Sequence, residues 1–230
     1  MGIYTAVITE PRIHRVWKLV LNNFLTNLDE RWDFLIVCGL LNKDFLIELI
    51  ETNFKEHKHR ITIHQLNIEN FSFIEHEKFW TEPYLYELIP TETFLTFQLD
   101  TLISAKYKDY IYDFIQYDYV GAPWSHSVGH GHELVGNGGL SLRKKSIILN
   151  IIENISSEDK VLYPNHDILF SNKIINNKPS VDVAKLFSIE TYFSEKSFGI
   201  HAPYKYLSPD ELCKISEYIP ELYELIELNK

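Results

Sequence analysis

The sequence is poor in the residues that mark disulfide-bonded or membrane-spanning chains. Only two of its 230 residues are cysteine, and Cys38 closes the apolar run of residues 34–38, where a small buried thiol is the ordinary interpretation. We therefore expect no structural disulfide. The chain has no stretch of about 18 apolar residues, and no basic region followed by a long apolar one stands at its N-terminus. These absences predict a soluble, cytoplasmic protein with no transmembrane segment.

Positive charge is scarce as well. The chain has 22 Lys and Arg against 32 Asp and Glu, a formal net charge of -10 at pH 7, and no Lys/Arg-rich stretch that would attract a phosphate backbone against this field. This balance argues against nucleic acid as a partner. Hydrophobic residues make up 45% of the sequence and no long polar tract interrupts them, which is enough for one α/β domain with a substantial core. We expect residues 1–230 to form a single domain.

Apolar runs in the first half alternate between strand-like and helix-like patterns. Strands are predicted at 4–9, 34–38 and 61–66, and helices from Pro11 onward and over 43–54. In the first helix one apolar stripe is formed by Ile13, Val16, Trp17, Val20, Leu21 and Phe24. Such alternation is typical of a mostly parallel central sheet flanked by helices.

The second half continues less regularly. Strand ends are predicted at 94–100 and 119–124, a strand at 139–143, and helices at 145–155 and 166–175. Ser208, Pro209 and Glu211 form a capping-box pattern that should open a helix running to Pro220. We expect the C-terminal helices of residues 208–228 to pack on the same domain.

Polar residues that terminate apolar runs are the candidate ligand-binding residues, because open α/β sheets bind ligands at the carboxyl ends of their strands. Three places qualify: Thr9, Glu10 and Arg12 after the first strand, Gln98 and Asp100 after the run from 94, and the glycine-rich segment 136–139. Asp100 could equally be a helix N-cap, and Asn137-Gly138 could be a hairpin turn. The glycine-rich segment opens no helix and does not fit G-x-G-x-x-G, which argues against a nicotinamide cofactor.

Several motifs together resemble a known family. Phe-Gln-Leu-Asp (97–100), Val-Gly-Ala-Pro-Trp (120–124), Val-Gly-Asn-Gly-Gly-Leu-Ser-Leu-Arg (135–143) and Phe-Gly-Ile-His-Ala-Pro-Tyr-Lys-Tyr-Leu (198–207) are similar to those of a glycosyltransferase-like family of unknown function in the GT-A superfamily. The resemblance spans about residues 5 to 207. The family usually reads Gln-Thr-Asp-Ser at 98–101 and Glu-Asp-Val at 166–168, so Asp100 and Asp167 keep both carboxylate positions.

The resemblance implies a GT-A (Rossmann-like) fold, a UDP-type sugar donor and a divalent metal. Asp100 and His201 are the implied metal ligands; a histidine ligand favours Mn²⁺ over Mg²⁺. A metal is chemically needed because a sugar diphosphate leaves poorly until its charge is neutralised. His201 could instead be structural. Thr9, Glu10, Arg12 and Gln98 are the expected nucleotide-binding residues.

The donor sugar and the acceptor are expected beside the glycine-rich segment. The resemblance assigns them Asn137, Gly138 and Gly139, with Arg143 on the strand behind, and Trp124 is added as an aromatic ring that could stack on a sugar. Asp167 is the candidate catalytic base of an inverting transfer, since such a base removes the proton of the acceptor hydroxyl. Alternatively, Asp167 is a structural residue at the N-terminus of a helix, where its charge interacts with the helix dipole.

Two further groups have open interpretations. His126, His130 and His132 could hold zinc, or could belong to an acceptor-side lid or a polar loop. Trp80, Trp124 and Tyr204 could stack on sugar rings or simply pack in the core.

The sequence therefore predicts a metal-dependent glycosyltransferase that moves a sugar from a nucleotide-diphosphate donor to a hydroxyl of a glycan, protein or small molecule. One alternative is a nucleotidyltransferase, although residues 8–14 lack the glycine-rich basic loop typical of that class. The other is a catalytically inactive nucleotide- or sugar-binding module. The altered motif at 98–100 favours this alternative.

Overall fold

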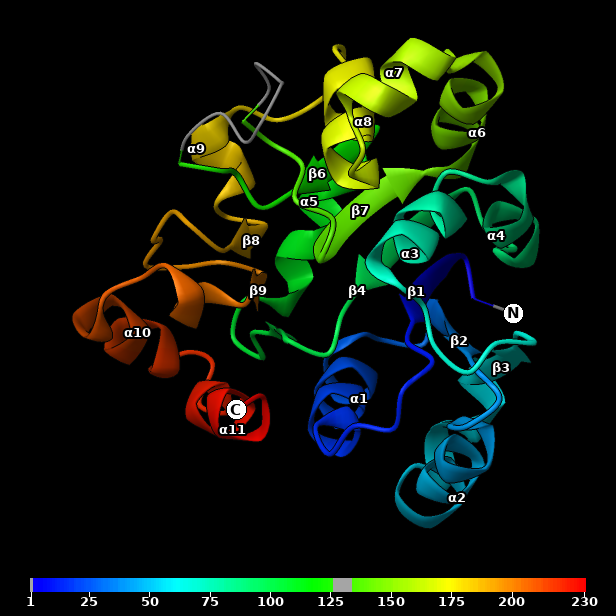
Figure 1. The fold of residues 1–230 in the computed structure, drawn as a ribbon. Helices are drawn as coiled ribbons and strands as arrows, with labels where there is room; N and C mark the ends of the chain where they lie inside the picture. The colour runs from blue at the N-terminus through cyan, green and yellow to red at the C-terminus, as the bar shows by residue number, and fades with distance from the viewer. Residues whose placement is uncertain (1, 126–133) are drawn as a thin grey trace.

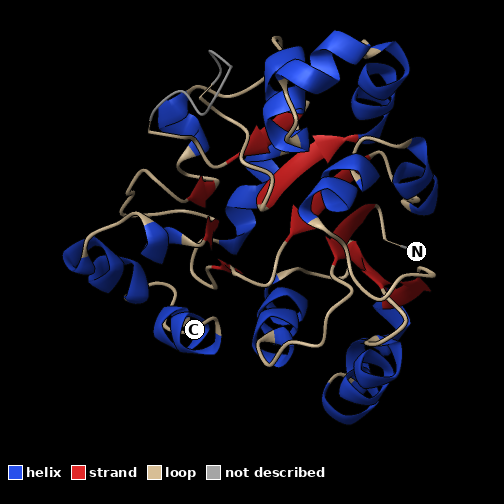
Figure 2. Cartoon of the chain, in the orientation of Figure 1, coloured by secondary structure: helices blue, strands red, loops and turns tan. Residues whose placement is uncertain are grey.

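The centre of the molecule is a six-stranded sheet in the order β3-β2-β1-β4-β7-β6. Our computed structural model describes residues 2–125 and 134–230. The strands are β1 (Tyr4–Thr9), β2 (Trp32–Cys38), β3 (Ile61–Gln65), β4 (Thr93–Phe97), β6 (Tyr119–Gly121) and β7 (Leu140–Lys144). The first four run parallel, whereas β7 is antiparallel to both of its neighbours. The predicted α/β architecture, a central sheet flanked by helices, is confirmed (Figure 2), and the antiparallel β7 was not predicted.

Helices cover both faces of this sheet. The longer ones are α1 (Trp17–Asn27), α2 (Lys43–Asn53), α3 (Phe73–Phe79), α4 (Pro83–Leu88), α6 (Lys145–Asn154), α7 (Ser157–Leu162), α8 (His166–Lys173), α10 (Pro209–Ser216) and α11 (Leu222–Leu228), and the short ones are α5 (Ile111–Phe114) and α9 (Val181–Ala184). Figure 1 shows α1 and α2 on one side of the sheet and α3, α4, α6 and α8 on the other. In the described part of the chain, none of these helices is long and apolar enough to cross a bilayer.

Alternate residues of the inner strands supply two separate cores. Ala6 and Ile8 of β1 pack with α1, whereas Val7 between them packs with α3, α4, α6 and α8. This alternation follows from the two-residue repeat of a strand, and it explains why the β1 run is apolar throughout. Cys38 ends β2 as a buried free thiol, as the sequence predicted, and Cys213 is free and exposed.

The predicted start of the first helix is wrong. Helix α1 begins at Trp17 rather than at Pro11, and Ile13, expected on the buried stripe, is 58% exposed. The intervening loop is held by side chains: Asn42 Nδ2 and the Trp17 indole N–H both donate to the carbonyl of Arg12, at 3.1 Å each. These bonds fix the loop that follows β1 in a non-helical form.

A second, three-stranded sheet carries the residues that follow β4. It has the order β5-β9-β8, with β5 (Thr101–Ile103) antiparallel to β9 (Gly199–His201), and β8 (Ser188–Ile189) parallel to β9. Asp100 therefore precedes a strand, and its interpretation as a helix N-cap is wrong. The pairing places Thr101 opposite His201, and Ala202 N donates to Asp100 O at 2.9 Å.

The glycine-rich segment is not a hairpin turn. Strands β6 and β7 do pair antiparallel, but residues 122–139 separate them, which is far longer than a two-residue turn. Such a turn needs positive φ at Asn137 and Gly138, and in the described chain only Gly136 among the residues of this segment has it, with φ 140°. His126, His130 and His132 lie outside the described residues.

The C-terminal helices pack on the face that α1 covers. Helix α10 starts with the predicted capping box of Ser208 and Glu211, although it ends at Ser216, before Pro220. Ile215, Ile219, Leu222 and Leu225 are fully buried in the same core as the apolar residues of α1.

Candidate functional site

A cavity of about 430 Å³ lies at the carboxyl ends of β1 and β4. Its wall includes all the predicted nucleotide-binding residues and Asp100, joined by two residues of α3: Thr9, Glu10, Arg12, His76, Glu77, Gln98 and Asp100. These residues meet because β1 and β4 are parallel neighbours, so their carboxyl ends lie at the same sheet edge.

Glu10 and Arg12 form a bidentate pair at the wall of the cavity. Arg12 Nε donates to Glu10 Oε1 at 2.8 Å and Nη2 to Oε2 at 2.7 Å, while the Arg12 side chain remains 61% exposed. The hydrogen bonds to Glu10 raise the pKa of Arg12. Glu10 therefore holds the Arg12 guanidinium in a fixed place at the cavity, with its outer face open to a ligand.

Asp100 and His201 face each other from β-strand ends that are far apart in the sequence. Asp100 Oδ1 lies 3.4 Å from His201 Nε2, and Oδ2 lies 3.1 Å from Lys205 Nζ. Burial raises the pKa of Asp100, but His201 and Lys205 outweigh it and hold this pKa well below its usual range. Burial lowers the pKa of His201, but Asp100 and Glu190 raise it to about 10.

Glu190 stands behind His201 and was missed from the sequence. Its Oε1 lies 3.2 Å from His201 Nδ1 without hydrogen-bond geometry, and Oε2 is buried without a hydrogen-bond partner among the described residues. The strand before it, Ser188–Ile189, has only two residues, which is too short for a strand pattern to mark the carboxylate that follows.

The glycine-rich segment binds Glu190 and packs against His201. Asn137 Nδ2 donates to Glu190 Oε1 at 3.0 Å, and Asn137 Oδ1 accepts from Gly139 N at 2.8 Å. A Cβ on Gly139 would meet three atoms of the His201 ring at distances that real Cβ atoms essentially never show. Glycine is therefore required at this position because the imidazole lies directly against the backbone.

The donor set suits a divalent cation. The Asp100 carboxylate faces Nε2 of the His201 imidazole at 3.4 Å, whereas the buried Glu190 carboxylate lies at Nδ1, on the other side of the ring. Carboxylate and imidazole together are ligands that Mn²⁺ accepts. Asp100 and His201 therefore fit the implied metal.

Asp167 lies in the first turn of α8 and contacts the glycine-rich segment. Its Oδ2 accepts from Gly138 N at 3.1 Å and its Oδ1 from Ile168 N at 2.7 Å. The second bond satisfies a helix N-terminal amide, which fits the structural interpretation, and the first joins Asp167 to the segment expected to bind the sugar. Asp167, Asn137, Gly138, Gly139, Trp124 and His201 do not line the 430 Å³ cavity.

Two of the three candidate stacking aromatics are buried. Trp124 is 6% exposed and Trp80 is 4% exposed, so both belong to the interior. Trp80 stacks on His166 with ring centroids 5.2 Å apart. Tyr204 is half-buried beside Lys205.

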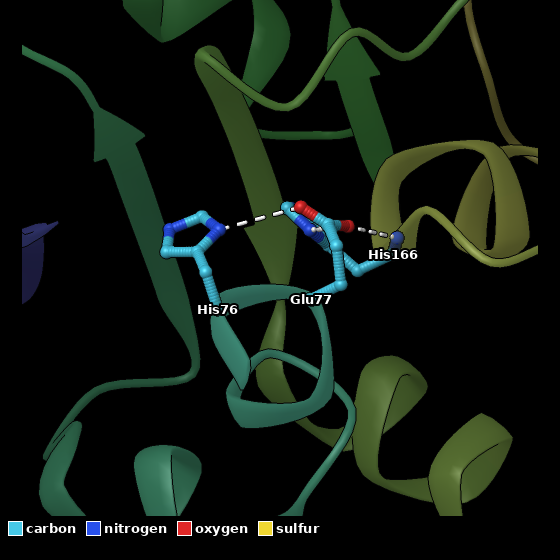
Figure 3. A group of neighbouring side chains, drawn as sticks. All are labelled: His76, Glu77 and His166. Atoms are coloured by element: carbon cyan, nitrogen blue, oxygen red, sulfur yellow. Dashed lines mark hydrogen bonds and ion pairs between the residues drawn. The ribbon is translucent and has the colours of Figure 1, made fainter. Parts of the chain in front are cut away.

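Helix α3 brings His76 and Glu77 to the cavity, and neither was predicted. With His166 of α8 they form a cluster whose potential ligand atoms all lie within 4.8 Å of one another (Figure 3). Residues 67–82 show no clear apolar period, so neither the helix nor the cluster could be recognised from the pattern. A capping box of Ser72 and Glu75 was the available signal for the start of the helix.

Comparison with known proteins gives the family and the fold. A model of the family described as "Protein of unknown function (DUF5672)" matches residues 60–201. No curated protein matches the sequence. Among solved structures, the glycosyltransferase GlyE of Streptococcus pneumoniae TIGR4 is similar with a TM-score of 0.55 and 9% identity. The match covers 92% of this chain but only 56% of GlyE, and at this identity it shows a shared fold alone. Because the family match spans more than half of the sequence, the chain belongs to the DUF5672 family of proteins of unknown function.

Proposed function

We propose that this chain is a metal-dependent glycosyltransferase of the GT-A type, which transfers a sugar from a nucleotide-diphosphate donor to a hydroxyl acceptor. We expect the nucleotide of the donor to be UDP. The observation that carries the proposal is the meeting of Thr9, Glu10, Arg12, Gln98 and Asp100 in one cavity, with His201 facing Asp100. The likeness of the fold to a glycosyltransferase supports it.

Asp100 and His201 would hold Mn²⁺ or Mg²⁺. When bound, the cation supplies the positive charge that makes the nucleoside diphosphate a better leaving group. Lys205 adds a charge beside it, since Nζ lies 3.1 Å from Asp100 Oδ2 and the side chain is 50% exposed. Arg12, held by Glu10, supplies a second fixed cation to the cavity. Both side chains would contact the phosphates or ribose of the donor.

The segment of Asn137, Gly138 and Gly139 would present its backbone to the donor sugar and the acceptor. Asp167, held by Gly138 N, would take the proton of the acceptor hydroxyl as the new bond forms at the face opposite the diphosphate. This arrangement gives inversion at the anomeric carbon. The acceptor belongs to the class of glycans, proteins or small molecules with a free hydroxyl.

The proposal is tested by thermal denaturation with UDP and GDP, with and without Mn²⁺, followed by turnover assays on a panel of UDP- and GDP-sugars. We expect a nucleoside diphosphate to raise the melting temperature in the presence of Mn²⁺ only, and one sugar donor to release its diphosphate. Pyrophosphate release from a nucleoside triphosphate would identify a nucleotidyltransferase instead. Mn²⁺-dependent binding without release from any donor would identify an inactive binding module.

Asp100→Asn is the matching variant. The change removes the negative charge while keeping the side-chain shape, so the Mn²⁺-dependent stabilisation by UDP should disappear. That stabilisation reaches about 2.7 kcal/mol at a ligand concentration one hundred times the dissociation constant. The exposed Asp109→Asn serves as control and should respond to UDP as the unaltered chain does. Tight Mn²⁺-dependent UDP binding by Asp100→Asn would remove Asp100 from the metal site.

A further inference from the structure

A buried carboxylate on α3 links the cavity to the helix that carries Asp167. Glu77 Oε2 accepts from His166 N at 2.7 Å and lies 2.8 Å from His166 Nδ1. Its other oxygen, Oε1, lies 3.3 Å from His76 Nδ1. Figure 3 shows the dashed lines that join one Glu77 oxygen to the His76 ring and the other oxygen to His166. The function proposed above does not use this cluster.

The protons in the cluster follow from its outer partners. Trp80 Nε1 donates to His76 Nε2 at 3.2 Å, and Arg143 Nη2 lies 3.4 Å from His166 Nε2. An indole N–H and a guanidinium can only donate, so both Nε2 atoms accept, and Nδ1 of each ring carries the proton. Both Nδ1–H groups then donate to Glu77. A metal bound at either Nδ1 would leave the ring proton on Nε2, facing the Trp80 or Arg143 donor, so this geometry favours a hydrogen-bond network over a metal site.

The electrostatics agree with this assignment. Burial raises the pKa of Glu77, but the hydrogen bonds from His166 and His76 outweigh it and hold this pKa well below its usual range. Burial, aided by the Arg143 guanidinium, lowers the pKa of His166 against the pull of Glu77. The neutral His166 imidazole therefore lies between the buried Glu77 carboxylate and the buried Arg143 guanidinium. The guanidinium itself lies over three aromatic rings, those of Trp80, Tyr119 and Phe170, at 5.0, 5.1 and 5.6 Å.

Glu77 also takes the place of the cap of α8. The N-cap residue Asn165 makes no side-chain capping bond within the described chain, and the amide of His166 donates to Glu77 instead. Asp167 is the next residue and holds Gly138 N. A Cβ on Gly138 would lie 2.9 Å from both His166 Nε2 and Asp167 Cβ, so these two residues pack directly against the glycine-rich segment.

We propose that Glu77 is a positioning residue, which acts through His166 to fix the N-terminus of α8 and thereby the placement of Asp167 against Gly138. The inference rests on the proposed function for the role of Asp167 and goes beyond it by assigning the residue that holds Asp167 in place. Glu77 takes no part in the proton transfer itself.

Glu77→Gln tests the assignment. An amide offers one acceptor oxygen where the carboxylate offers two, so one of the donors from His166 or His76 loses its partner. We expect the turnover number to fall about tenfold to a hundredfold, which is the effect of misplacing a catalytic group by a fraction of an ångström to an ångström. Glu77 also lines the cavity, so the UDP-dependent thermal shift is measured alongside; the loss of turnover at saturating donor should exceed any change in the donor KM, because Asp167 acts in the transfer step.

Glu75→Gln is the matched control, since it makes the same change on the same helix at an exposed site and glutamine also serves in a capping box. Its turnover number should equal that of the unaltered chain. If Glu77→Gln does not fold, Glu77→Asp replaces it, because the shorter carboxylate keeps the charge but retracts it from His166. An unchanged turnover number in the folded Glu77 variant, or an equal loss in Glu75→Gln, would overturn the assignment.

A second measurement does not depend on activity. Two-dimensional ¹H–¹⁵N NMR of the imidazoles near neutral pH should show His76 and His166 protonated at Nδ1 only, and Glu77→Gln should shift the His166 resonances. Protonation of His166 at Nε2, or one equivalent of metal in the purified protein that Glu77→Gln loses, would overturn the network. If the unaltered chain transfers no sugar from any donor, the proposed function fails, and the NMR result still decides whether Glu77 holds His166.

Discussion

At the scale of single residues, Gly139 has surroundings that leave no room for a side chain. The backbone of Gly139 lies against the His201 ring, so any side chain there displaces the candidate metal ligand. Asn137 binds both Gly139 N and Glu190, which couples the segment expected to contact sugar to the histidine expected to contact metal. A shift of either part would therefore be transmitted to the other.

Gly139→Ala should destabilise the fold by about 1–3 kcal/mol, the usual cost of overpacking a buried site, and weaken Mn²⁺-dependent UDP binding. The clash is with one ring, so the same substitution in a His201→Ala background should cost clearly less. Urea denaturation of the two single variants and the double variant completes this cycle. Equal costs of Gly139→Ala in both backgrounds would show that the clash with His201 is not what excludes a side chain.

His166 gives the molecule a pH dependence with a defined sign. Burial and Arg143 lower its pKa, so the folded chain keeps His166 neutral while the unfolded chain takes up a proton there below about pH 6.5. The free energy of unfolding should therefore fall as the pH drops below that value, by at most about 1.4 kcal/mol for each pH unit.

His166→Asn isolates this contribution, since asparagine keeps an N–H donor toward Glu77 but does not titrate. Its loss of stability between about pH 7 and pH 5 should be smaller than that of the unaltered chain. His59→Asn is the control, because its side chain is 64% exposed. Urea denaturation at both pH values measures the difference, and identical losses in His166→Asn and the unaltered chain would contradict the prediction.

At the scale of elements, the sequence identifies the strands that are long and apolar. β1, β2 and β3 follow runs of five to seven residues with strong strand patterns. β5 and β9 have three residues each, which is too short for a pattern to stand out. Their pairing brings Asp100 to His201, so the contact could be anticipated only from the family resemblance and not from spacing. Glu77 and Glu190 were not predicted as site residues.

Local hydrogen bonds explain the remaining differences. The helix expected from Pro11 starts six residues later because Asn42, distant in sequence, binds the backbone of the loop. Helix α3 was not predicted although Ser72 and Glu75 form a complete capping box, since its few apolar residues give no clear period. The capping box therefore indicates the start of α3, although the apolar periodicity does not.

Ser72→Ala tests whether the first turn of α3 contributes to UDP binding as well as to stability. Loss of the cap costs about 1 kcal/mol of unfolding free energy. Ser156→Ala removes the same type of capping box from α7 and should cost a similar amount. Because Ser72 and Phe73 line the cavity, only Ser72→Ala should also weaken UDP-dependent stabilisation. Thermal denaturation with and without UDP and Mn²⁺ compares them, and equal UDP responses would separate the first turn of α3 from the nucleotide site.

At the scale of the whole molecule, charge opposes the proposed ligand. The chain carries a formal charge of -10, and a nucleoside diphosphate is itself anionic. The cavity therefore has to supply local positive charge, and Arg12 and Lys205 are the cations placed beside Glu10 and Asp100. Each is paired with a carboxylate, so neither pair adds net positive charge. The proposed divalent cation at Asp100 would supply it.

The final prediction concerns the C-terminal helices. Their fully buried residues, Ile215, Ile219, Leu222 and Leu225, share a core with α1. Arg15 donates to the carbonyls of Glu227 and Leu228, and Asn229, which lines the cavity, donates to Leu99 O at 3.3 Å. Burial of one such apolar side chain stabilises a protein by about 1.5–3 kcal/mol, so four amount to about the whole stability of an ordinary domain.

We therefore expect the intact chain to unfold in one cooperative transition, as a single domain should, and a chain ending at residue 207 to lose that transition. Circular dichroism during thermal denaturation measures both. Leu222→Ala is a milder change that should leave the chain folded and lower the unfolding free energy by about 2–5 kcal/mol. Tyr223 lies on the same helix and is 51% exposed, so Tyr223→Ala should have little effect. A truncated chain with an unchanged melting temperature would show instead that residues 208–230 are an appendage, and the contact of Asn229 with Leu99 would then contribute nothing to the cavity beside Asp100.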